Sequence, residues 1–107
     1  MSLKKQMVKY KKRRDKIEKQ VNKLYEQYNE VKNEINFLED EINKISTKDL
    51  TIVENAADLK TANVLLDNAE SALEIIETKI AKKVLMFNAM DKVLDECLQN
   101  LEREKEQ

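Results

Sequence analysis

Apolar residues recur at alternating spacings of four and three along the first half of the chain. These positions are Leu3, Met7, Tyr10, Arg14, Ile17, Val21, Leu24, Tyr28, Val31, Ile35, Leu38, Ile42 and Ile45. Twelve of the thirteen are apolar or tyrosine, and the exception is Arg14. This alternation is typical of the a and d positions of a coiled-coil seam. It predicts one long helix over about residues 3–46.

A second apolar ladder with a spacing of seven runs through the other half of the chain. Its members are Ile52, Leu59, Leu66, Leu73, Ile80, Phe87, Leu94 and Leu101. Further apolar residues flank it, with Ala62, Ala69, Ile76, Met90 and Cys97 on one side, Leu65, Ala72, Met86 and Val93 beyond those, and Ala56, Val84 and Leu98 on the other side. The resulting face is roughly 140° wide, broader than a two-helix seam requires. We expect a second helix over about 51–102, with a break near 60–63 as an alternative and fraying after residue 101.

A turn between the two helices is predicted at residues 46–51. The chain contains no Gly and no Pro, and Ser46-Thr47-Lys48-Asp49 is its one turn-like cluster. Ser, Thr and Asp favour helix N-caps because their side chains accept backbone hydrogen bonds. Either Ser46 or Thr47 with Asp49, or a capping box of Thr51 and Glu54, is expected to start the second helix.

The turn and the two ladders together predict a register for an antiparallel hairpin. The d residues of the first helix are Leu3, Tyr10, Ile17, Leu24, Val31, Leu38 and Ile45. When they are paired in antiparallel order with the second ladder, from Leu94 back to Ile52, every pair of residue numbers adds to 97. The expected neighbours, within about one helical turn, are Tyr10 with Phe87, Ile17 with Ile80, Leu24 with Leu73, Val31 with Leu66, and Leu38 with Leu59. The same register brings Lys4 and Lys5 level with residues 91–96.

Composition agrees with an all-α fold, because a 107-residue chain without Gly or Pro lacks the residues that punctuate most loops. We therefore predict one helical hairpin domain over residues 1–107. The broad apolar face predicts that a partner, a second copy or a folded-back third helix completes a three- or four-helix bundle. A homodimer is the expected assembly.

The compartment follows from the cysteine count and from the apolar runs. The single cysteine, Cys97, has no intramolecular disulfide partner, which favours the reducing cytoplasm. No apolar signal-peptide core follows the N-terminus. The longest unbroken apolar run, Val84–Phe87, has four residues, so no transmembrane segment is expected.

The residue inventory argues against an enzyme. The chain has no His, the commonest general base and metal ligand, and no Gly for a phosphate-binding loop. Glu70, Glu74 and Glu77 share one stretch of helix, but di-metal bundles also use Glu-x-x-His pairs, which are absent. We interpret these three as a polar edge. No catalytic residue, cofactor, metal site or small-molecule substrate is predicted.

Basic residues concentrate near the N-terminus and form a candidate basic patch. Its members are Lys9, Lys11, Lys12, Arg13 and Lys16. A basic segment followed by heptads superficially resembles basic-zipper DNA-binding helices. Here, however, the seam already runs through the basic segment. We expect these charges to pair with the acidic residues of 88–107, and binding of nucleic acid or an anionic surface is the alternative. Arg14 on the seam either fixes the register or extends its head outward.

The stretch Val84–Met90 is the candidate docking surface for a partner. Four successive apolar residues point in four directions around a helix, so one neighbouring helix cannot cover them all. Methionine also suits binding surfaces that must adapt. The predicted partner-binding residues are Leu65, Val84, Leu85, Met86, Met90 and Val93.

These features predict a non-enzymatic coiled-coil interaction protein, acting as an adaptor, scaffold or chaperone-type assembly factor that docks partner helices. In outline alone, the hairpin is similar to tubulin-folding cofactor A, to the stalk subunits of export ATPases and to small secreted hairpins with a Trp-x-Gly turn. The chain has neither Trp nor Gly, so the motif of the last family is absent. The likeness assigns no residue roles.

Overall fold

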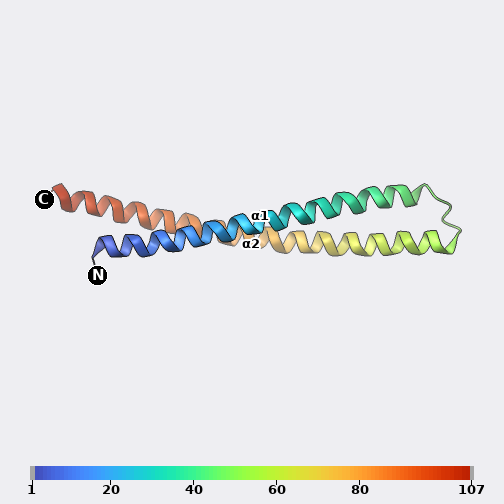
Figure 1. The fold of residues 1–107 in the computed structure, drawn as a ribbon, viewed down its shortest axis with the longest axis horizontal. Helices are drawn as coiled ribbons and strands as arrows, with labels where there is room; N and C mark the ends of the chain where they lie inside the picture. The colour runs from blue at the N-terminus through green and yellow to red at the C-terminus, as the bar shows by residue number, and fades with distance from the viewer. Residues whose placement is uncertain (1, 107) are drawn as a thin grey trace. The chain divides into compact units, whose positions relative to one another are not determined.

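A computed structural model describes the backbone of residues 2–106 and the side chains of 2–105. Helix α1 spans Leu3–Ser46 and helix α2 spans Val53–Glu106, and a turn connects them into a helical hairpin (Figure 1). The predicted all-α hairpin is confirmed, and no strand occurs in the described range. Helix α2 begins two residues later than predicted. It runs unbroken through 60–63 and continues to Glu106, beyond the predicted end near 102. The fraying of residues 102–107 stays a prediction.

Contacts between the helices divide the hairpin into two compact units. Unit 1 consists of Met1–Leu24 and Lys79–Gln107, and unit 2 consists of Tyr25–Thr78. The interpretation of residues 1–107 as a single domain stays a prediction.

The predicted first seam is buried along its whole length. All thirteen positions are buried or half-buried, whereas most of the charged residues between them are exposed. Ile17 is among the most buried residues of unit 1, and Ile35 and Leu38 are among the most buried of unit 2. The alternation of four and three therefore selects the inner face of α1, because it keeps apolar side chains on one stripe of the helix.

Helix α2 buries a seam that is narrower than its apolar face. Ala62, Ile80, Leu94 and Cys97 are buried. The outer flank is exposed at Ala56, Leu65, Met86 and Leu98. Ile52, predicted as the first ladder residue, precedes the helix and is 50% exposed. Two helices contact each other along a line, so the rest of a broad apolar face stays uncovered within each unit.

The turn contains no glycine, and side-chain hydrogen bonds stabilise the end of α1. The hydroxyl of Ser46 donates to the Ile42 carbonyl, and that of Thr47 donates to the Lys44 carbonyl, each at 2.7 Å. Both hydroxyls thus donate to carbonyls in the last turns of α1, and the prediction that they start α2 is wrong. Asp49 instead accepts the side-chain and backbone hydrogen bonds that order the residues before α2.

Asp49 organises the residues before α2 as an Asx-turn. Its carboxylate accepts the Thr51 hydroxyl at 2.7 Å and the Thr51 backbone N–H at 3.0 Å. Its backbone carbonyl accepts the Asn55 side-chain amide at 3.0 Å. The bond from the Thr51 hydroxyl, followed by the bond from its N–H, lowers the pKa of Asp49 below the ordinary value.

Asp49→Ala is expected to destabilise the hairpin in a pH-dependent way. A lowered pKa means that the ionised carboxylate is bound better in the folded chain, so its stabilisation is present above the ordinary pKa of 3.8. That stabilisation is lost as the pH falls through the lowered value. Urea midpoints from circular dichroism should therefore differ between wild type and Asp49→Ala at neutral pH and converge in acid.

Ser46→Ala is the matched control for the Asp49 prediction. It also removes one hydroxyl bond from the end of a helix, but no carboxylate takes part in that bond. Its effect on the urea midpoint should be similar at both pH values. A pH-independent effect of Asp49→Ala would contradict the role given to its carboxylate.

Candidate partner-binding site

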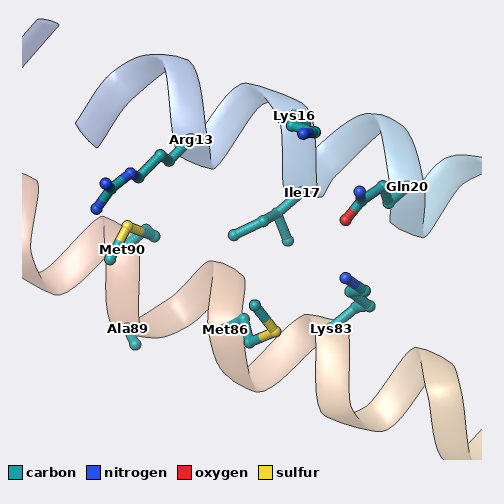
Figure 2. Close-up of a pocket in the computed structure, with 8 residues that line it drawn as sticks. All are labelled: Arg13, Lys16, Ile17, Gln20, Lys83, Met86, Ala89 and Met90. Atoms are coloured by element: carbon teal, nitrogen blue, oxygen red, sulfur yellow. The ribbon is translucent and has the colours of Figure 1, made fainter. Parts of the chain in front are cut away.

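Unit 1 shows how the two helices are aligned. The Arg14 guanidinium Nη1 lies 3.1 Å from the Asp91 carboxylate Oδ1. Ile17 points toward Met86 and Met90, as Figure 2 shows. Ile17 was expected beside Ile80, so the predicted register is wrong by about one heptad in this unit.

The repeating seam explains this error. A shift of seven residues returns apolar positions to apolar positions, so both registers bury the same kind of side chain. Leu94 lines a groove with Met7 and Val8, four and five residues further along α1 than Leu3, which the predicted register placed beside it. The pairs Val31 with Leu66 and Leu38 with Leu59, both in unit 2, stay predictions, as does Leu24 with Leu73.

Arg14 bridges the two helices from its seam position. Its side chain is 28% exposed, and its guanidinium also lies 3.5 Å from Asp15. The hydrogen bond to Asp91 is the main cause that raises the pKa of Arg14, with desolvation opposing it and both carboxylates adding to it. Arg14, which lies among the residues of the basic patch without being counted in it, thus pairs with an acidic residue of α2. The contact fits the register alternative for this residue better than the outward one.

A groove with a basic rim lies along one edge of the seam in unit 1. We call it the basic groove, and its volume is about 450 Å³. It is lined by Arg13, Lys16, Ile17, Gln20, Lys83, Met86, Ala89 and Met90. In Figure 2 the Arg13 side chain reaches toward Met90, and Gln20 faces Lys83 across the groove. The groove therefore combines an apolar floor with three cationic side chains at its rim.

A second groove lies elsewhere in unit 1. Its volume is about 530 Å³, and it is lined by Lys4, Met7, Val8, Lys11, Arg14, Leu94, Asp95 and Leu98. Lys4 and Asp95 thus line the same groove, and residue 95 lies within the range 91–96 that was expected level with Lys4. Arg14 is already engaged by Asp91, and Asp95 adds a negative charge, so this groove is less uniformly basic.

The predicted partner-binding residues fall into three groups. Met86, which is 47% exposed, and Met90 line the basic groove. Val84 and Val93 are half-buried in unit 1, and Leu85 is 69% exposed but lines neither groove of unit 1. Leu65 is exposed in unit 2 and so belongs to a different surface.

The basic patch is exposed throughout, at Lys9, Lys11, Lys12, Arg13 and Lys16. Arg13 and Lys16 line the basic groove, and Lys11 lines the second groove. None of the five forms an ion pair with any side chain described in 2–105, so their expected pairing with residues 88–107 is not seen there.

Lys83 is the rim residue that the sequence reasoning missed. The heptad spacing could have identified it, because Lys83 lies seven residues from both Ile76 and Met90, at a seam position of α2. Gln20 and Ala89 gave no such signal, since small or neutral polar residues are common on any helix surface.

Comparison with protein-family models, curated proteins and solved structures finds no match for this chain. Neither of the described helices is long and apolar enough to cross a membrane.

The observed register predicts a specific intramolecular crosslink. Gln20→Cys with Lys83→Cys, in a Cys97→Ser background, should crosslink efficiently within one chain under a short thiol-reactive reagent, because these side chains face each other. Arg14→Cys with Lys83→Cys is the control, because the register that adds to 97 would make this pair adjacent. Crosslinking is read by gel mobility and mass spectrometry. Faster crosslinking of the control would show that the helices pair in the register whose residue numbers add to 97.

Proposed function

We propose that this chain is a non-enzymatic coiled-coil interaction protein, an adaptor, scaffold or assembly factor that docks a partner helix in the basic groove. The observation that carries the proposal is the apolar floor of this groove, with half-exposed Met86 outside the seam. Docking an amphipathic helix in an apolar groove is a recurrent mode of peptide recognition. Such a helix extends the two-helix unit toward a three- or four-helix bundle.

The groove defines the chemistry of its partner. Methionine side chains adapt to partners of different shape, so Met86 and Met90 favour an apolar stripe of large side chains. Arg13, Lys16 and Lys83 at the rim favour acidic residues beside that stripe. Rim charges contribute mainly to specificity and association rate, while the apolar contact supplies affinity. We place this activity in the cytoplasm because the single cysteine suits a reducing compartment.

A defined peptide tests the proposal. A labelled helical peptide with a Leu and Phe stripe flanked by Glu should bind the full chain in fluorescence anisotropy, and its counterpart flanked by Lys should bind at least tenfold more weakly. Met86→Asp should abolish binding, because a carboxylate would then lie on the apolar floor. Leu85→Asp is the control, since Leu85 is exposed and outside the groove. Equal loss in both variants would contradict docking in the groove.

A second candidate function is binding of nucleic acid or another anionic surface through the basic patch. The full exposure of its five cationic side chains favours it. Phosphate contacts release counterions, so affinity for a labelled oligonucleotide would fall steeply with salt, whereas apolar helix docking depends weakly on it. Lys9→Gln with Lys12→Gln lies outside both grooves of unit 1. This variant should weaken oligonucleotide binding without affecting peptide binding.

A further inference from the structure

The two units carry opposite charge. Unit 1 has sixteen Lys and Arg against eight Asp and Glu, whereas unit 2 has four against thirteen. The excess of eight positive charges in one unit nearly cancels the excess of nine negative charges in the other, which leaves the chain at −1. Unit 2 of a second copy therefore has the charge that the rim of the basic groove favours.

One stripe of α1 carries this change of sign residue by residue. Spacings of three and four connect Arg13, Lys16, Gln20, Lys23, Gln27, Glu30, Glu34, Phe37 and Glu41. The charged members before Gln27 are basic, and those after it are acidic. Two such stripes that run antiparallel about Gln27 bring opposite charges together at two pairs, Arg13 with Glu41 and Lys23 with Glu30. The neutral Gln20 faces Glu34. The same arrangement brings Lys16 level with Phe37.

Phe37 offers an exposed apolar side chain that suits the apolar floor of the basic groove. It is 58% exposed, while Leu38, the next residue, is buried in the seam. Aromatic rings make favourable contacts with methionine sulfur, and Met86 and Met90 form part of the groove floor. The rim residues Arg13 and Lys16 and the residue Phe37 all belong to the unbroken helix α1. In the antiparallel arrangement of two copies, the Phe37 that lies level with Lys16 belongs to the other copy.

We propose that the partner helix is α1 of a second copy, which pairs antiparallel about Gln27 and inserts its Phe37 into the basic groove. A two-fold axis makes the contact reciprocal, because each copy gives one stripe and receives the other, and the assembly closes as a dimer. This inference rests on the proposed docking function of the groove and identifies its occupant.

A crosslink at the proposed axis tests the pairing. In the full chain with Cys97→Ser, Gln27→Cys should oxidise to a disulfide-linked dimer, because residue 27 faces its own copy. Asn29→Cys is the matched control, since Asn29 is also exposed but lies about 200° around the helix. Rapid dimer formation by Gln27→Cys alone supports the proposal. Equal rates in both variants, or none in either, would overturn it.

A charge exchange tests the partner's identity by analytical ultracentrifugation. Arg13→Glu with Lys16→Glu and Lys23→Glu should raise the dimer dissociation constant at least tenfold, and so should Glu30→Lys with Glu34→Lys and Glu41→Lys. Mixing the two variants should restore a one-to-one dimer. The stripe of the first variant is then acidic on both sides of Gln27 and the stripe of the second is basic on both sides, so opposite charges face each other along the whole pairing. Failure of the mixture to associate would overturn self-pairing.

The peptide separates the failure of this inference from the failure of the proposed function. The variant with Lys at 30, 34 and 41 keeps its basic groove and lacks the stripe that would occupy it. A monomeric wild type together with tight peptide binding by this variant would overturn the self-pairing and leave the docking function standing. No peptide binding by this variant would overturn the docking function itself.

Discussion

Leu38→Ala is expected to lower the free energy of unfolding by about 2–5 kcal/mol, the range measured when large aliphatic core residues are truncated. Leu38 is 5% exposed, the lowest value among the buried apolar residues described in 2–105. Truncation removes favourable apolar contacts and leaves a cavity that neighbouring helix backbone cannot easily fill. Urea denaturation followed by circular dichroism, in dilute protein, measures the change.

Phe37→Ala is the matched control for this prediction. Phe37 precedes Leu38 on the same helix and is the larger side chain, yet it is largely exposed. Its truncation should change the unfolding free energy by less than about 0.5 kcal/mol, as is usual for surface positions. The self-association proposed for α1 should nevertheless weaken. A large loss of stability in dilute Phe37→Ala would show that the ring is covered within its own chain.

Phe87→Ala and Met86→Asp are expected to separate folding from association. Phe87 lies on the seam and is half-buried, so its truncation should cost about 2–3 kcal/mol, less than the range for fully buried aromatic residues. Met86 lies beside the seam on the floor of the basic groove. Met86→Asp should therefore keep its helix content while association weakens at least tenfold.

Circular dichroism and sedimentation distinguish these two variants. Loss of association without loss of helix in Met86→Asp supports the assignment of Met86 to a docking surface. Equal loss of helix in both variants would instead place Met86 in the folding core. Cys97 is buried, so both variants retain it to leave the seam unchanged.

Parts of the candidate site were predictable because they depend on helical spacing alone. Met86 and Met90 stood out since four successive apolar residues cannot all face one neighbour. The contact across the groove was not predictable, because Gln20 and Lys83 face each other only in the observed register. That register shifts by one heptad from the predicted one, and the shift decides which residues of α1 face Met86.

The sequence by itself determined the two helices, the inner face of α1 and the place of the turn. These depend on local features, namely apolar spacing, the absence of Gly and Pro, and the polar cluster from Ser46 to Asp49. The tertiary structure alone decided the register in unit 1, the pairing of Arg14 with Asp91 and the division into two units of opposite charge. The physical reason is that a heptad repeat buries equivalent side chains after every shift of seven residues. Single contacts such as the ion pair at Arg14 distinguish one alignment from the next, and they form only when both helices are in place.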